Sequence, residues 1–233
     1  MTQTEQLINV GKAYIDALKE LKEDRPNEVA GILDILDCIH PEPGYHFGIY
    51  IEEPSPDEAV THACDQSWFH CYQGDEEPIM RRPFCAEKYS NIDHHQNMSY
   101  LRFTFNLFNH LIVEPTAMGA WQAYLLSISK TLLPFSGRLY YTKRELIMTS
   151  DQLQQRRLWA GLKKISDIVT TAKDVSPFVQ MDESQAWVSS CYWSDWGGLI
   201  REYAKFSFIN GRTFVPGDFY HETLYKYDCG IMY

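Results

Sequence analysis

The segment from Pro26 to Met80 contains neither lysine nor arginine, although it holds twelve acidic residues, four histidines and three cysteines. At the average frequency of basic residues in this chain, a segment of that length would hold about five. Residues 1–100 carry 19 acidic and 7 basic side chains, a net charge of -12, whereas residues 101–233 carry 12 and 14, a net charge of +2. The sequence therefore predicts one strongly negative face. This face says more about the binding partners of the protein than about any reaction that it catalyses.

The chain also lacks the features of membrane and secreted proteins. It has no run of about 18 apolar residues, the length that a membrane-spanning helix needs. Its N-terminus has neither the basic nor the apolar region of a secretory signal, so we expect a cytoplasmic protein without membrane association. The six cysteines show no close pairing and no C-x-x-C motif, which argues against a disulfide-stapled scaffold.

Several catalytic and nucleic-acid-binding signatures are absent as well. The sequence has no G-x-S-x-G elbow, no P-loop and no G-x-G-x-x-G fingerprint, which removes the most readable hydrolase, NTPase and dehydrogenase classes. Neutralising phosphates requires clustered basic residues, and the net charge of the chain is -10, so we expect no binding to nucleic acid. The best basic patch is Arg156, Arg157, Lys163 and Lys164. That spacing is more typical of a solvated helix face, or of a complement to the acidic half.

Apolar periodicity predicts helices and strands in mixed order. Helices are expected at 2–22, 27–40, 115–133 and 149–170, with capping-box pairs at Thr2/Glu5 and Thr149/Gln152. Strands are expected at 45–51, 67–72, 101–106, 139–148 and 224–233, with a hairpin at Asn210-Gly211. The predicted fold is α+β, with a largely antiparallel sheet and about four helices packed on it. We expect a single compact domain, 1–233, with an acidic N-terminal half (1–100) and an aromatic-rich β C-terminal part (185–233).

The acidic segment provides the leading functional hypothesis. Ordinary surfaces intersperse both signs of charge, so solubility alone does not explain the missing basic residues. The predicted binding residues are Glu52, Glu53, Asp57, Glu58, Trp68, Asp75, Glu76 and Glu77. A negative patch with an aromatic anchor attracts a basic protein quickly and specifically. The sequence therefore predicts a soluble interaction protein that binds a basic protein partner, by analogy of charge and size with inhibitors and immunity proteins.

A metal-dependent hydrolase is the first alternative. Ten of the fourteen histidines and cysteines lie between Cys38 and His95, and such ligands on an acidic segment suit zinc. The candidate ligands are His62, Cys64, His70, His94 and His95. The spacing matches no known finger or H-E-x-x-H motif, and neighbours on a strand, such as His70 and Cys71, point to opposite faces. Scattered surface histidines and buried cysteines are therefore the favoured interpretation, without any cofactor.

A small-ligand or carbohydrate-binding module is the further alternative. Trp187, Trp193 and Trp196 lie within ten residues and precede Gly197-Gly198, so they form either an aromatic platform or a core of cross-strand pairs. Cys191 and His221 are a possible thiol nucleophile and base, although no local motif marks them, and a buried structural thiol is the simpler interpretation of Cys191. The sequence predicts no oligomeric state.

Overall fold

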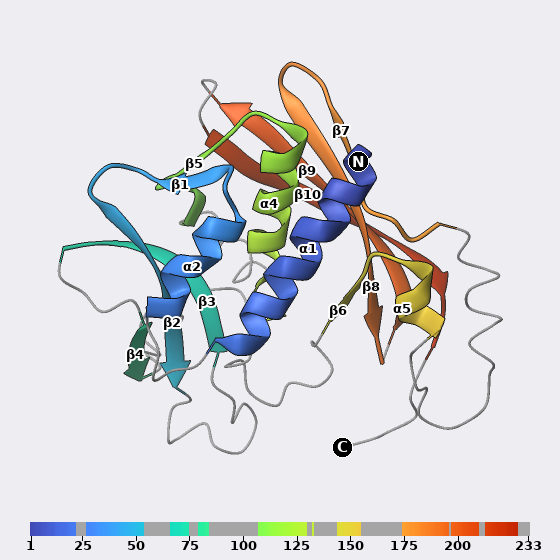
Figure 1. The fold of residues 1–233 in the computed structure, drawn as a ribbon, viewed down its shortest axis with the longest axis horizontal. Helices are drawn as coiled ribbons and strands as arrows, with labels where there is room; N and C mark the ends of the chain where they lie inside the picture. The colour runs from blue at the N-terminus through green and yellow to red at the C-terminus, as the bar shows by residue number, and fades with distance from the viewer. Residues whose placement is uncertain are drawn as a thin grey trace, which may run out of the picture.

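The computed structural model describes residues 1–21, 27–53, 66–74, 79–83, 107–129, 132, 144–154, 174–195, 197–209 and 213–227. Within them the helices are α1 (Gln3–Glu20), α2 (Asn27–Ile35), α4 (Ala117–Ser127) and α5 (Ser150–Gln154). The strands are β1 (Ile39–Pro41), β2 (Tyr45–Glu53), β3 (Gln66–Gln73), β4 (Ile79–Pro83), β5 (Leu111–Val113), β6 (Glu145–Ile147), β7 (Phe178–Met181), β8 (Gln185–Ser194), β9 (Gly198–Ile209) and β10 (Thr213–Tyr225). This arrangement confirms the predicted α+β class (Figure 1).

The described strands form three sheets. The largest has the order β10-β9-β8-β6, and β7 pairs with β8 along the same edge as β6. The second has the order β3-β2-β4, and the third is the two-stranded ribbon β1-β5. All pairs are antiparallel except β2 and β4, which run parallel. The strands are thus largely antiparallel, as predicted, but they are divided among separate sheets.

Helix α1 begins where the sequence predicts. The Thr2 side chain accepts a hydrogen bond from the Glu5 amide, and the Glu5 carboxylate accepts one from the Thr2 amide, which completes the capping box. Leu7, Tyr14 and Leu18 lie on one stripe of the helix and are almost completely buried. This stripe attaches α1 to the core.

Helix α4 lies at the centre of the molecule and is buried on every side from its third residue to its end. Three of its polar side chains contact other parts of the chain. The Trp121 indole donates to the Leu7 carbonyl of α1 at 2.9 Å, and the Gln122 amide donates to Asp37, after α2, at 2.8 Å. The Tyr124 hydroxyl donates to a carboxylate of β9 at 2.9 Å. Buried polar groups need such partners, so these bonds fix α4 relative to its neighbours.

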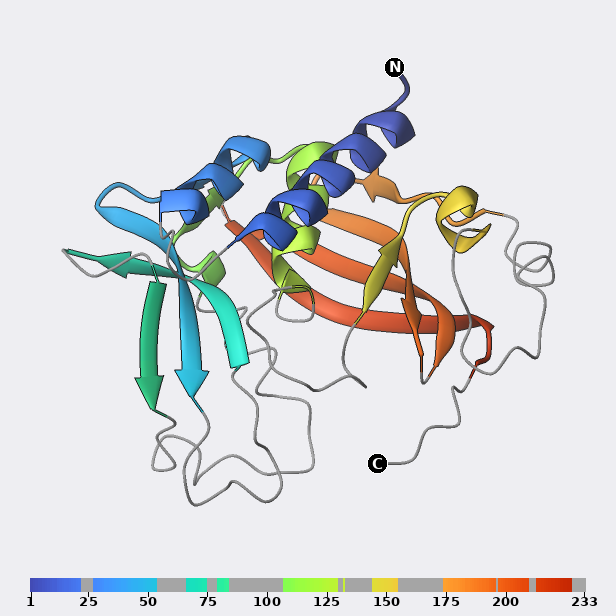
Figure 2. The same ribbon diagram turned by 60° about the horizontal axis from the view of Figure 1, so that its bottom comes forward.

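The largest sheet packs one face against α4, and α1 packs against α4 in turn (Figure 2). Ala186 and Val188 of β8, together with Ala204 and Phe206 of β9, are fully buried in the main core on that face. A second apolar cluster covers one end of the opposite face. Its buried members are Ile147, Leu153, Val175, Cys191, Trp193 and Leu199. The aromatic C-terminal part is therefore built into the core from both faces.

Some predicted boundaries need correction. Thr116 caps α4, so Pro115 lies before the helix and outside its first turn. Strand β10 ends at Tyr225, so residues 226 and 227 do not continue the predicted terminal strand. The hairpin is confirmed, because Ile209 pairs with Thr213. The predicted strand at 101–106 and most of the predicted helix at 149–170 lie outside the described residues. No described helix is long and apolar enough to cross a membrane.

Candidate functional site

The predicted acidic site is described only in part. Glu52 and Glu53 end β2, and Trp68 lies in β3 opposite Tyr50. The other predicted binding residues, Asp57, Glu58, Asp75, Glu76 and Glu77, lie outside the described residues. The same holds for the basic residues Arg156, Arg157, Lys163 and Lys164. Whether these basic residues compensate the acidic ones therefore stays a prediction.

The two acidic segments of the predicted site, which follow Glu53 and Gly74, are attached at different places on the β2–β3 hairpin. Glu52 pairs with Gln66 at one end of the hairpin, and Tyr45 pairs with Gln73 at the other. Seven residues of strand span about 23 Å. The acidic segments that follow Glu53 and Gly74 are thus attached to opposite ends of the hairpin.

Strand β4 brings basic positions beside one of these ends. In the parallel register of β2 and β4, Ile51 pairs with Arg81 and Glu52 pairs with Arg82. These arginines are the first basic residues after the basic-free segment. The pairing of β4 with β2 therefore places the end of the basic-free segment next to the strand that carries Glu52 and Glu53.

A different acidic surface surrounds the β1–β5 ribbon. His40 and Ile112 face each other across the ribbon, and both are exposed, Ile112 by 38%. Asp37 and Glu114 lie at one end of the ribbon, where the Glu114 amide donates to the Cys38 carbonyl. At the other end, the Glu42 amide donates to the His110 carbonyl. We call Asp37, His40, Glu42, Ile112 and Glu114 the ribbon surface.

Local interactions hold this surface in place. The Gln122 side chain accepts a hydrogen bond from the Cys38 amide at 2.8 Å and donates to the Asp37 carboxylate at 2.8 Å. The Glu114 carbonyl accepts a hydrogen bond from the amide of Thr116, the residue that caps α4. The end of the ribbon that carries Asp37 and Glu114 is thus tied to the central helix, and this part of the surface is preorganised.

The ribbon surface is electrically negative. Within the described chain, no lysine or arginine forms an ion pair with Asp37, Glu42 or Glu114; the imidazole of His110 lies 3.6 Å from Glu42. The pKa of Cys38 is raised from 9.0 to about 12, first by burial and then by the charges of Asp37 and Glu114. The raised pKa of the Cys38 thiol therefore reports the negative potential at the ribbon surface.

Sequence reasoning missed most of this surface. Asp37 and Glu42 lie in the segment without lysine or arginine, and this absence of basic residues could have identified them. Ile112 and Glu114 lie about seventy residues downstream, in and directly after a three-residue strand that shows no readable alternation. Their proximity to Asp37 follows from long-range pairing alone.

The predicted metal ligands are described only at His70. His62, Cys64, His94 and His95 lie outside the described residues. His70 lies opposite Gly48, and burial lowers its pKa to about 4. The next residue, Cys71, lies on the other face, where its thiol contacts the His110 carbonyl, and burial with the charge of Glu42 raises its pKa to about 12. The described part of the chain contains no group of three or more potential metal ligands.

Cys191 and His221 do not form a nucleophile–base pair. Cys191 pairs with Arg201, and His221 pairs with Glu202, the next residue of β9. Successive residues of a strand point to opposite faces, so the thiol and the imidazole lie on opposite sides of the sheet. Cys191 is 1% exposed, and burial raises its pKa, which agrees with a structural thiol.

The tryptophans do not form one platform either. Trp193 is 1% exposed and belongs to the second core cluster, whereas Trp187 is half-buried with the Lys205 ammonium 5.2 Å from its ring centre. Six residues of strand separate them by about 20 Å. Trp196 lies outside the described residues. The core interpretation therefore holds for Trp193.

Comparison with known proteins assigns no family. No family model matches the sequence, and no curated protein or solved structure shows significant similarity to it.

Proposed function

We propose that this chain is an interaction protein that binds a basic protein partner through the ribbon surface, in the manner of an inhibitor or immunity protein. One observation carries the proposal. The exposed pair of His40 and Ile112 is framed by Asp37, Glu42 and Glu114, which have no lysine or arginine partner within the described chain. An apolar centre with a charged frame is the usual arrangement of a protein-binding patch.

The arrangement suggests the chemistry of the partner. A complementary surface would present lysine or arginine side chains to the three carboxylates and an apolar hollow to Ile112. Burying the exposed part of Ile112 would contribute about 1 kcal/mol, because a whole side chain of this size contributes about 1.5–3 kcal/mol. The carboxylates would mainly accelerate association, and physiological salt would screen them over about 8 Å.

In this proposal, the acidic residues predicted from the sequence extend the negative field. Glu52, Glu53 and the acidic residues that follow them would attract the partner from a distance, while the ribbon surface makes contact. Trp68 would be an additional anchor only if the partner also covers the β2–β3 hairpin.

A pull-down with matched charge variants tests the proposal. The ribbon variant, Glu42→Lys/Glu114→Lys, leaves the Asp37–Gln122 bond intact. The control, Glu20→Lys/Glu183→Lys, makes the same change in net charge at exposed positions on α1 and in the β7–β8 turn. We expect the wild type and the control to retain one basic protein from a native lysate at low salt, and the ribbon variant to lose it.

Two further results would support or contradict the proposal. The retained protein should be released by high salt, and Ile112→Ala should accelerate its dissociation without changing the association rate much. Equal retention by the ribbon variant and the control, or retention that salt does not weaken, would rule out the ribbon surface.

A further inference from the structure

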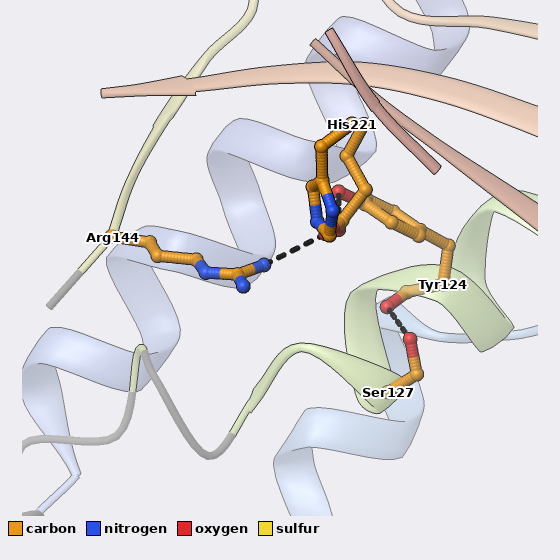
Figure 3. A network of polar contacts seen from close by, with 5 residues as sticks. Tyr124, Ser127, Arg144 and His221 are labelled. Atoms are coloured by element: carbon orange, nitrogen blue, oxygen red, sulfur yellow. Dashed lines mark hydrogen bonds and ion pairs between the residues drawn. The ribbon is translucent and has the colours of Figure 1, made fainter. Parts of the chain in front are cut away.

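A buried carboxylate lies between α4 and the largest sheet. Glu202 of β9 is 2% exposed and receives three hydrogen bonds. Its Oε1 atom accepts from the Tyr124 hydroxyl at 2.9 Å. Its Oε2 atom accepts from Arg144 Nη1 at 2.9 Å and contacts His221 Nε2 at 2.5 Å. Figure 3 shows Arg144, His221 and Tyr124 converging from different elements.

An irregularity in the sheet aligns His221 with this carboxylate. Near the hairpin, the β9–β10 register pairs Phe206 with Pro216, and this register would place Tyr220 opposite Glu202. A shift of one residue between Pro216 and Phe219 brings His221 there instead. Bulges of this kind occur often beside active sites, where they redirect a side chain.

Glu202 determines which nitrogen of His221 carries the proton. Burial alone raises the pKa of Glu202, but the hydrogen bond from His221 and the positive charge of Arg144 lower it below its ordinary value. The carboxylate is therefore ionised at neutral pH and can only accept hydrogen bonds. The Nε2 atom of His221 must donate, so Nδ1 is the basic nitrogen of the neutral ring.

The imidazole is open to solvent, unlike the carboxylate that orients it. Its side chain is 44% exposed, and β10 is an edge strand of the sheet. Neutralising Glu202 requires only Arg144, so a purely structural network would not need to reach the surface. His221 extends the network to a place that a substrate can reach.

Arg144 is held beside His221. Both side chains contact the same oxygen of Glu202, so the guanidinium and the imidazole are neighbours. The guanidinium also lies 4.3 Å from the ring centre of Tyr192, whose edge-on contact with His221 spans 6.3 Å. A fixed positive charge thus lies beside the imidazole.

We propose that His221 is the general base of a hydrolytic site for an ester of a carboxylic or phosphoric acid. Glu202 is its positioning residue, and Arg144 binds the negative charge that develops on the substrate. None of its residues belongs to the ribbon surface, and the proposal does not depend on the function proposed for that surface.

The chemical step uses water as the nucleophile. His221 Nδ1 takes a proton from a water molecule as the water oxygen bonds to the acyl carbon or the phosphorus. Negative charge collects on the carbonyl or phosphoryl oxygen beside Arg144. The bond to the leaving oxygen breaks, and the imidazolium returns its proton to that oxygen, which releases an acid and an alcohol. General-base catalysis of this kind typically contributes a factor of about 10² to 10⁴.

Hydrolysis of two chromogenic esters tests the site. The probes are p-nitrophenyl acetate and bis(p-nitrophenyl) phosphate, and whichever is cleaved identifies the acyl or the phosphoryl class. We expect His221→Asn to reduce the rate at least about 100-fold and Glu202→Gln to reduce kcat about 10- to 100-fold. The control is His46→Asn, which removes another exposed histidine on β2 and should leave the rate unchanged.

Two additional measurements separate catalysis from a structural role. Nitrogen-15 NMR should show His221 protonated at Nε2 in the wild type, and this preference should disappear in Glu202→Gln. If Glu202→Gln does not fold, Glu202→Asp and Arg144→Lys replace it, each with a thermal unfolding curve. The proposal fails if the wild type cleaves neither probe faster than free imidazole does, if His221→Asn retains the rate, or if Nδ1 carries the proton.

Discussion

The side chain of Gln122, fully buried in α4, donates a hydrogen bond of 2.8 Å to the carboxylate of Asp37, an exposed residue 85 positions earlier in the chain. The same amide accepts from the Cys38 backbone. One interior residue therefore fixes both the backbone and an acidic group of the ribbon surface. The position of that surface depends on the core, and a core mutation can change it.

Gln122→Met should destabilise the protein by about 1–3 kcal/mol, because it preserves the volume of the side chain but leaves the Cys38 amide without its partner. Chemical denaturation monitored by tryptophan fluorescence measures the change. Gln180→Met, at an exposed position of β7, is the matched control and should change stability by less than about 0.5 kcal/mol. Equal effects of the two variants would contradict the role assigned to Gln122.

The reactivity of Cys38 should report the negative potential at the ribbon surface. Burial, Asp37 and Glu114 together raise the pKa of Cys38 to about 12, so the wild-type thiol should react slowly with iodoacetamide near pH 9. Glu114→Gln removes one negative charge, lowers this pKa and should accelerate alkylation of Cys38 several-fold. Mass spectrometry of tryptic peptides measures the rate, and Glu183→Gln serves as control. An unchanged rate in Glu114→Gln would show that the charge of Glu114 does not raise this pKa.

Acid should weaken the network around Glu202. Because the folded-state pKa of Glu202 lies below its ordinary value of 4.5, its contribution to stability is complete above about pH 4.5 and is lost as the pH falls through the folded-state value. The groups that face this carboxylate are Tyr124, Arg144 and His221. Glu202→Gln should therefore be clearly less stable than the wild type at pH 7, and the difference should shrink towards pH 3. Denaturant titrations of both proteins across this range measure it, and a difference independent of pH would contradict the assignment.

Two glycines with the same backbone conformation should respond differently to substitution. Gly44 and Gly198 both have φ +86°, which favours glycine, but a Cβ at Gly44 meets nothing within 4 Å, whereas at Gly198 it would lie 2.0 Å from the Tyr225 carbonyl oxygen. Gly44→Ala should cost about 1–2 kcal/mol from backbone strain alone. Gly198→Ala should cost at least 1–3 kcal/mol more, because the end of β10 must move. Thermal unfolding of both variants tests the difference, and equal costs would contradict it.

The elements that sequence reasoning found are those with strong local signals. The capping box at Thr2 and Glu5 and the Asn210-Gly211 turn both specify structure within a few residues. The ribbon strands β1 and β5 have three residues each, too few for any periodicity to show. They exist because pairing across seventy residues satisfies their backbones, and local sequence does not encode such a contact.

The Glu202 network was hidden from the sequence for a related reason. A regular hairpin extended from the Asn210-Gly211 turn would place Tyr220 opposite Glu202, and only the bulge after Pro216 corrects the register to His221. Arg144 and Tyr124 come from elements more than fifty residues away. Nothing in the spacing of these residues indicates that they meet. The sequence indicates only His221, as a possible base for a Cys191 nucleophile, and Cys191 lies on the other face of the sheet.

The central position of α4 has a consequence for biosynthesis. The helix is buried on every side, and the strands of the largest sheet that contact it, β7, β8 and β10, are complete only at Tyr225. At about 5–20 residues per second, the ribosome needs roughly 5–20 s to proceed from the end of α4 to that point. The apolar helix α4 of the nascent chain is therefore exposed during this interval, and molecular chaperones should bind it there. Stop-codon variants that end before β8 should accumulate as inclusion bodies.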